Sequence, residues 1–189
     1  MSERNNENEI QLWNSFKEGN TEPFVTIFKN YYTALFQYGC KMTRDTNLVE
    51  DVIQDLFVDL WRSSGKAEIQ SLKAYLFSAF KFKLLKAIKD AGKSAALPNG
   101  GNEIAFEISH ELVLIDKEQN EELKQKLALS MRELTARQRE IIYLKFYLNF
   151  NYEEVSKIMD ISYQASRNLL YQSIKAIKKM IPLLIFFFP

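Results

Sequence analysis

The chain has 189 residues, of which 47% are hydrophobic and 26% are charged, and its formal net charge at pH 7 is +1. This composition is that of an ordinary globular protein with one or two domains. The near-zero charge excludes a global basic field, so any contact with DNA must come from local patches or from a larger complex that supplies most of the affinity.

The N-terminal end of the chain is polar and lacks the apolar core of a signal peptide: it reads MSERNNENE. A single cysteine, Cys40, excludes an intramolecular disulfide and fits a reducing compartment, where we expect a buried thiol with a packing role. A cytoplasmic location is therefore the prediction. From Ile10 to about Asp90 the pattern is helical throughout, with breaks at Gly19-Asn20, at 43–47 and at 64–66. Ser71 is expected to cap the helix that follows the last break.

The segment Leu48–Trp61 has two adjacent apolar ridges, which are wider than one core contact needs. Beside them three carboxylates recur at four-residue steps, at Asp51, Asp55 and Asp59. Like charges at this spacing weaken a helix slightly, so the acidic stripe suits a basic protein partner. The alternative is a solvated acidic face on a helix of the core.

The next predicted helix, Lys73 to about Lys89, has the opposite charge, because no acidic residue occurs between Glu68 and Asp90. Lysines and aromatic residues interleave along it, a combination that can hold a phosphate backbone while rings stack on exposed bases. For Phe77 and Phe80 we expect burial in the core. For the lysines we expect contact with DNA, and the alternative is that they only solubilise the helix.

The middle of the chain reads as a linker, since DAGKSAALPNGGN is rich in small residues and glycine. The single histidine, His110, lies in this region and is expected to be solvated. No catalytic constellation, cofactor motif or set of metal ligands is recognisable, so we expect no enzyme, no cofactor and no metal site.

Helical periodicity returns near Glu121, and Thr135 with Gln138 forms a capping box that opens a helix from Ala136 to about Leu148. Two short helical patterns then follow in 151–179 with only Asp160-Ile161 between them, which predicts a helix-turn-helix.

The start of its second helix, after the cap residue Ser162, is rich in side chains that reach base edges and phosphates. No acidic residue follows Asp160. The alternative is a helical hairpin with solvated polar residues. The apolar tail 181–188 is too short to span a bilayer and is expected to pack on the last domain or on a partner, and the alternative is a role at a membrane surface.

The fold class predicted from these elements is all-α, with two helical domains joined by a flexible linker. The predicted limits are 10–92 for the N-terminal domain, 93–120 for the linker and 121–181 for the helix-turn-helix domain.

In this order the pieces resemble an extracytoplasmic-function (ECF) sigma factor of the sigma-70 family, over about Ile10 to Lys179. The stretch LVEDVIQDLFVDLW is similar to the family's core-polymerase-binding helix, and SLKAYLFSAFKFKLLKAIK to the helix that melts and reads the −10 element. The C-terminal half is similar to sigma region 4, whose helix-turn-helix reads the −35 element.

The resemblance implies a protein that binds core RNA polymerase and directs promoter-specific initiation, and it assigns three groups of residues. The polymerase contacts would be Asp51, Gln54, Asp55, Phe57 and Trp61. The −10 contacts would be Lys81, Lys83, Lys86 and Lys89. The −35 contacts would be Tyr163, Gln164, Ser166, Arg167 and Tyr171.

The family also implies an anti-sigma partner, often anchored in a membrane.

This chain departs from the family's pattern in two places. Lysines stand near positions 81 and 88–89, where the family often has asparagine and arginine, and this leaves the −10 preference open. Asp160 replaces the usual glycine of the turn, and we expect the turn to survive because aspartate tolerates left-handed backbone.

Two other classes of protein compete with this interpretation. A free-standing helix-turn-helix regulator would not need the acidic and apolar surface of Leu48–Trp61. A helical adaptor without a DNA role would not need the acid-free C-terminal region or the lysine-rich helix.

Overall fold

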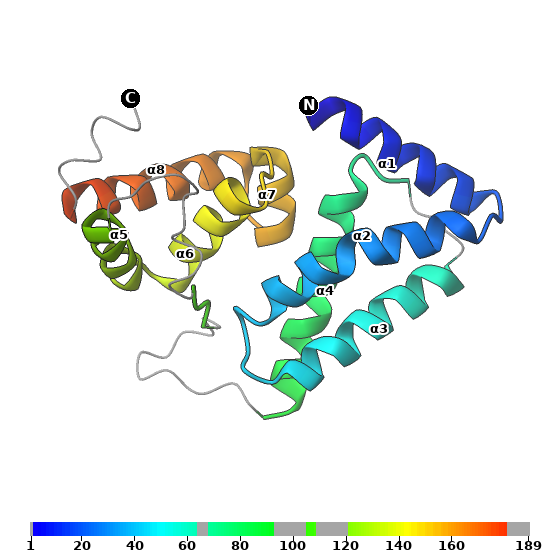
Figure 1. Cartoon of the computed structure of the whole chain (residues 1–189), viewed down its shortest axis with the longest axis horizontal. Helices are drawn as coiled ribbons and strands as arrows, with labels where there is room; N and C mark the ends of the chain where they lie inside the picture. The colour runs from blue at the N-terminus through cyan, green and yellow to red at the C-terminus, as the bar shows by residue number, and fades with distance from the viewer. Residues whose placement is uncertain (1, 64–67, 93–104, 109–120, 181–189) are drawn as a thin grey trace. The chain divides into compact units, whose positions relative to one another are not determined.

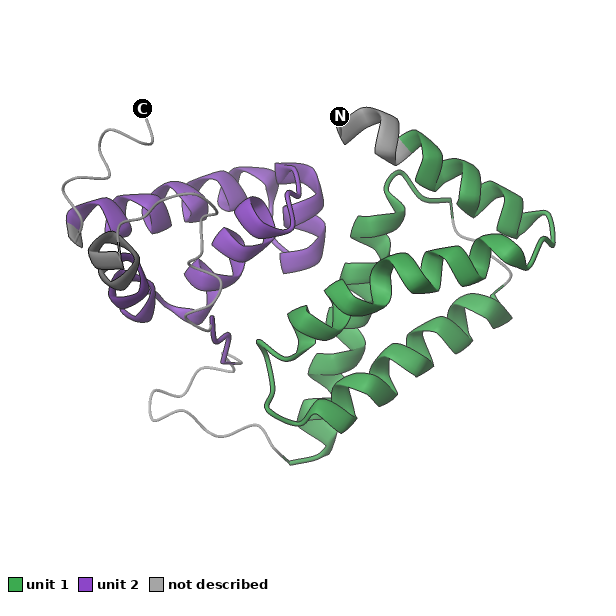
Figure 2. Cartoon of the chain, viewed as in Figure 1, with its two compact units in different colours: residues 1–104 green, residues 105–189 purple. Residues whose placement is uncertain are grey.

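The structure, a computed structural model, describes residues 2–63, 68–92, 105–108 and 121–180 (Figure 1). The predicted linker residues 93–104 and 109–120, with His110, and the tail 181–189 lie outside them. Within the described residues the chain is helical and has no strand, which confirms the all-α class. The chain divides into two compact units, 1–104 and 105–189 (Figure 2).

In its described residues, 2–63 and 68–92, unit 1 contains the helices α1 (Ser2–Lys17), α2 (Glu22–Gly39), α3 (Thr46–Arg62) and α4 (Leu72–Asp90). Side chains fix the start of two of them. The Leu48 N–H donates to Asp45 Oδ1 (3.1 Å) at the start of α3. The Ala74 N–H donates to Ser71 Oγ (3.2 Å) at the start of α4, so Ser71 is the cap that the sequence predicted. Helix α1 begins well before Ile10, where the sequence showed only polar residues.

The core of unit 1 lies where α2, α3 and α4 meet, and Phe77 and Phe80 are buried there as predicted. Gly39 makes this meeting possible. A Cβ on Gly39 would lie 2.7 Å from Val49 Cγ1 and 2.8 Å from Phe80 Cζ. Because no side chain fits at this position, glycine lets the end of α2 approach both other helices closely.

Unit 2 contains α5 (Glu121–Arg132), α6 (Ala136–Ile142), the π-helical turn η2 (Tyr143–Tyr147), α7 (Tyr152–Met159) and α8 (Tyr163–Met180). The predicted capping box of Thr135 with Gln138 is present, and a second one joins Asn151 and Glu154. The sequence predicted one helix from Ala136 to about Leu148. Instead its last part widens into the π-helical turn, where the Leu148 N–H donates to the Tyr143 carbonyl (3.0 Å).

Phe106 belongs to unit 2, although it lies inside the predicted linker. Its side chain is 2% exposed and meets the Tyr143 ring edge-on, with the ring centroids 5.7 Å apart. Arg139 Nε donates to the Phe106 carbonyl (2.6 Å), and the same guanidinium donates to the carbonyls of Arg132 and Leu134. Burial lowers the pKa of Arg139, and the charge of Glu107 opposes that shift. One arginine therefore fastens residues 105–108 to the turn between α5 and α6.

Candidate nucleic-acid interface

The turn between α7 and α8 has the compact geometry of a helix-turn-helix. Asp160 adopts the left-handed conformation (φ 51°, ψ 55°), so the prediction that aspartate would be tolerated there is confirmed. The Ile161 N–H donates to the Ser156 carbonyl (3.0 Å), which closes the end of α7. The Ala165 N–H donates to Ser162 Oγ (3.1 Å), so Ser162 caps α8 as predicted.

The buried side of α8 is marked by small hydroxyl side chains at the crossing with its neighbours. Ser166 is 0% exposed, and its hydroxyl donates to the Tyr163 carbonyl (2.7 Å) and lies 3.5 Å from the Tyr152 carbonyl on α7. Ser166 therefore packs the two helices together. The sequence-based assignment of Ser166 as a DNA contact is wrong in this structure, because no atom of it faces solvent.

The opposite side of α8 is polar and exposed. Tyr171 is 67% exposed, and the Arg167 guanidinium lies 6.0 Å from the centroid of the Tyr163 ring. Gln164 Nε2 donates to Asn168 Oδ1 (3.2 Å). This face carries Tyr163, Gln164, Arg167, Asn168, Tyr171, Gln172, Lys175 and Lys179.

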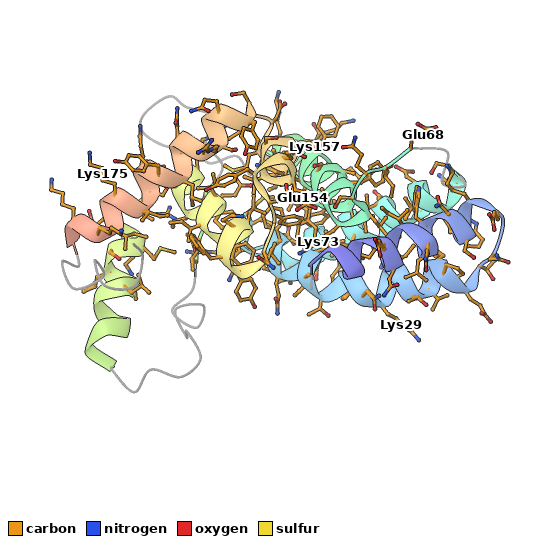
Figure 3. The ribbon with its side chains drawn as sticks, turned by 90° about the horizontal axis from the view of Figure 1, so that it is seen from above. Lys29, Glu68, Lys73, Glu154, Lys157 and Lys175 are labelled. Atoms are coloured by element: carbon orange, nitrogen blue, oxygen red, sulfur yellow. The ribbon has the colours of Figure 1, made fainter. Side chains whose placement is uncertain are left out.

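The set of −35 contacts implied by the family resemblance did not include Asn168, Gln172 and Lys175, although Asn168 belongs to the polar start of the helix that the sequence predicted to reach base edges. Lys175 projects away from α8 (Figure 3). Their position at three- and four-residue steps from Gln164 is the signal that would have added them.

Helix α4 presents a second surface, and it differs from the predicted one. Lys86 and Lys89 are exposed, and Lys81 is partly exposed. Lys83 instead turns toward α3, where its Nζ lies 2.5 Å from Asp59 Oδ2. Phe82 is one of the aromatic residues that the sequence interleaves with the lysines, although the −10 set did not include it. It is 73% exposed and shares a face with Lys86 and Lys89 at i, i+4 and i+7.

Helix α3 exposes the carboxylates Asp51 and Asp55 together with Gln54. Trp61 is 47% exposed, and its ring centroid lies 5.0 Å from that of Phe24 on α2. These side chains are available to a partner.

Phe57 is not available to a partner. It is 4% exposed and is packed between the rings of Phe24 and Phe28, with centroids 5.9 Å and 4.9 Å away. The sequence-based assignment of Phe57 as a polymerase contact is corrected accordingly, because Phe57 supports the surface from beneath.

No group of three or more acidic, cysteine or histidine side chains that could hold a metal ion occurs in the described parts of the chain. The helices described there include none that is both long and apolar enough to cross a membrane.

Comparison with known proteins agrees with two helical units, the second of which contains a helix-turn-helix. Residues 27–94 match the family Sigma-70 region 2, and residues 124–177 match the family Sigma-70, region 4. The chain is 23% identical over 154 residues to the ECF RNA polymerase sigma factor SigM of Bacillus subtilis (strain 168). The aligned residues cover 82% of this chain and 92% of SigM.

Two solved structures share the fold. CnrH, in complex with the cytosolic domain of CnrY, is 17% identical with a TM-score of 0.58, covering 91% of this chain and 96% of CnrH. RpoE of Bartonella quintana, in complex with the anti-sigma factor NepR, is 19% identical with a TM-score of 0.56, covering 84% of this chain and 96% of RpoE.

Unit 1 thus carries a region 2 domain and unit 2 carries a region 4 helix-turn-helix domain. The chain belongs to the sigma-70 family and is an ECF sigma factor, a protein that directs transcription initiation at promoters.

Proposed function

We propose that this sigma factor divides its work among three surfaces. Helix α8 binds the −35 duplex, the outer face of α4 binds the −10 strand, and the exposed face of α3 binds core RNA polymerase. The observation that carries the proposal is the exposed polar face of α8, the helix that follows the turn and is capped by Ser162. The protein has no catalysis of its own and works in the cytoplasm, where its polymerase is.

For α8, shape and charge both suit a major groove. An 18-residue helix is about 27 Å long, and the groove is about 12 Å wide, so the first two turns can enter while the rest follows the backbone. The absence of acidic residues after Asp160 removes repulsion from phosphate. Arg167 and Lys175 supply positive charge along the helix.

For α4, the combination of Phe82 with Lys86 and Lys89 favours an unpaired strand. A large aromatic ring left exposed on a helix offers a stacking surface to any base, and lysines on the same face hold the neighbouring phosphates. Lys81, at the edge of this face, is retained in the proposal. Lys83 is removed from it because its ammonium group is engaged by Asp59.

For α3, exposed carboxylates beside Trp61 suit a basic, partly apolar protein surface. Tryptophan at the centre of an interface is a frequent anchor of binding energy. Asp51, Gln54, Asp55 and Trp61 are therefore the proposed contacts with core RNA polymerase.

An anti-sigma factor is the proposed regulator. Two proteins with this fold are seen in complexes, one with the cytosolic domain of CnrY and the other with the anti-sigma factor NepR. The same surfaces that bind polymerase and DNA are available to such a partner, which would then act by competition. A membrane anchor for that partner is part of the proposal.

The test is transcription with purified core polymerase and a genomic DNA library, scored by mapping start sites that appear only when the protein is added. Arg167→Ala is expected to weaken initiation while leaving the affinity for core polymerase unchanged. Asp55→Lys combined with Trp61→Ala is expected to abolish core binding. Val25→Ala on the exposed face of α2 is the control.

Tight binding of duplex DNA by the protein alone, with no effect on core polymerase, would overturn the proposal in favour of a free-standing regulator. Loss of core binding in Arg167→Ala would overturn the division between the surfaces.

A further inference from the structure

We propose that Gln164 and Asn168 act as one hydrogen-bonded unit that reads a single adenine in the −35 duplex. The inference rests on the proposed role of α8 and specifies which chemical groups of the DNA it recognises.

The two amide side chains lie on the side of α8 that faces away from the rest of unit 2. Ser166 is fully buried, so it marks the direction that faces the rest of unit 2. Each residue of an α-helix is rotated by about 100° from the last, so residues two positions before and after Ser166 both lie on roughly the opposite side. Gln164 and Asn168 occupy these positions, and both are exposed. They form the part of α8 that would meet the floor of a groove first.

Arg167 lies differently, at about 100° from Ser166, on the flank of the helix. There its guanidinium lies 6.0 Å from the centroid of the Tyr163 ring, one turn earlier. A flank position meets the wall of the groove, which is lined by phosphates. The amide pair is therefore placed for base edges, and the Tyr163–Arg167 pair is placed for the backbone.

The hydrogen bond between the amides decides what they offer to a base. Gln164 Nε2 donates to Asn168 Oδ1 at 3.2 Å, which uses one donor and one lone pair. Gln164 keeps its carbonyl oxygen as an acceptor and its second amide proton as a donor, and Asn168 keeps both protons of its amide nitrogen as donors. The unit therefore presents an acceptor and a donor side by side.

Adenine matches that pattern in the major groove, because its N6 amino group donates and its N7 accepts. Guanine presents two acceptors there, cytosine presents its N4 donor, and thymine presents an acceptor beside a methyl group. The bond also restricts both side chains before DNA arrives, so less rotamer freedom is lost when the base is bound. A linked pair is thus expected to discriminate more sharply than either amide alone.

The test uses the full-length chain with core polymerase and a pool of duplexes whose promoter region is randomised. Duplexes that support initiation are sequenced, and each −35 position of the best one is then replaced by the other three base pairs. The wild type is expected to show one adenine whose replacement lowers initiation roughly tenfold or more. Gln164→Ala and Asn168→Ala are each expected to remove most of that discrimination.

Two controls separate reading from affinity. Gln172→Ala removes an exposed amide from a later turn of the same helix, and it should leave the adenine preference intact. Arg167→Ala should weaken initiation from all sequences alike. Thermal unfolding followed by circular dichroism checks that each variant is folded.

The outcomes are distinguishable. A pool that enriches no sequence overturns the proposed function itself. Enrichment with an adenine preference that survives Asn168→Ala overturns this inference alone. Loss of two separate base preferences in the two single variants shows independent readers and also overturns the linked unit. A double variant no worse than either single variant supports it, because the effects of coupled residues do not add.

Discussion

Lys83 Nζ on α4 lies 2.5 Å from Asp59 Oδ2 on α3, so a charge pair joins the two helices that carry the proposed −10 and polymerase surfaces of unit 1. The hydrogen bond and positive charge of Lys83 lower the pKa of the Asp59 carboxyl. The pair takes one lysine out of the predicted DNA contacts and one carboxylate out of the acidic stripe.

The salt dependence of promoter binding should therefore distinguish variants of lysines that contact phosphate from a variant of Lys83. Lys86→Ala is expected to weaken promoter binding by the polymerase complex and to reduce its salt slope by about 1, because one fewer counterion is released. Lys89→Ala should behave alike. Lys83→Ala should change the slope little. Binding titrations from low to high salt measure these slopes. If Lys83→Ala and Lys86→Ala had equal slopes, Lys83 would also contact a DNA phosphate.

The same pair predicts a pH dependence of stability. A carboxyl whose folded pKa is lowered stabilises the protein above its unfolded pKa of about 3.9, and that contribution is lost as the pH falls through the lower folded value. The urea midpoint of Asp59→Asn should thus lie slightly below that of the wild type at neutral pH. The difference should vanish in acid and shrink at high salt. A difference that grows in acid would contradict the assignment.

The sequence was a good guide wherever local chemistry decides structure. The cap residues Ser71, Thr135 and Ser162 were all predicted, since each needs only its own neighbours. It failed where side-chain direction depends on tertiary packing. The family resemblance assigned Ser166 to the −35 contacts and Phe57 to the polymerase contacts, but the packing of neighbouring helices buries both side chains.

The turn of the helix-turn-helix gives a prediction about backbone strain. Asp160 has φ 51°, and left-handed backbone costs about 1–2 kcal/mol for a residue with a Cβ. Asp160→Gly should therefore leave the free energy of unfolding of unit 2 unchanged or raise it, whereas Asp160→Val should lower it by about 1 kcal/mol or more. Urea unfolding followed by circular dichroism measures both. A destabilised Asp160→Gly would mean that the carboxylate, not the conformation, matters.

Gly39 gives a prediction about close packing in unit 1. A methyl group there would overlap Val49 and Phe80, so Gly39→Ala should lower stability by about 1–3 kcal/mol, the usual penalty of an overpacked core. The double variant Gly39→Ala with Val49→Ala should lose less stability than the two single variants lose together, because the smaller side chain makes room and so recovers part of the loss. No recovery in thermal unfolding would show that Phe80 alone sets the limit.

Phe106 tests whether residues 105–108 are part of unit 2. Its ring is buried against Tyr143, and Arg139 holds its carbonyl, so Phe106→Ala should destabilise unit 2. We expect a loss of roughly 3 kcal/mol, at the low end for phenylalanine because a short segment can partly undock instead of leaving a cavity.

The chain provides its own reporter for this experiment. Its two tryptophans, Trp13 and Trp61, both lie in unit 1, whereas circular dichroism follows the helices of both units. Phe106→Ala should shift only the part of the dichroism transition that tryptophan fluorescence does not report. Leu129→Ala, on the exposed side of α5, is the matched control and should stay within about 0.5 kcal/mol of the wild type. If Phe106→Ala shifts neither signal, residues 105–108 act only as a linker, because a docked segment must lower the stability of the unit that holds it. A shift of the fluorescence transition alone would instead assign the segment to unit 1.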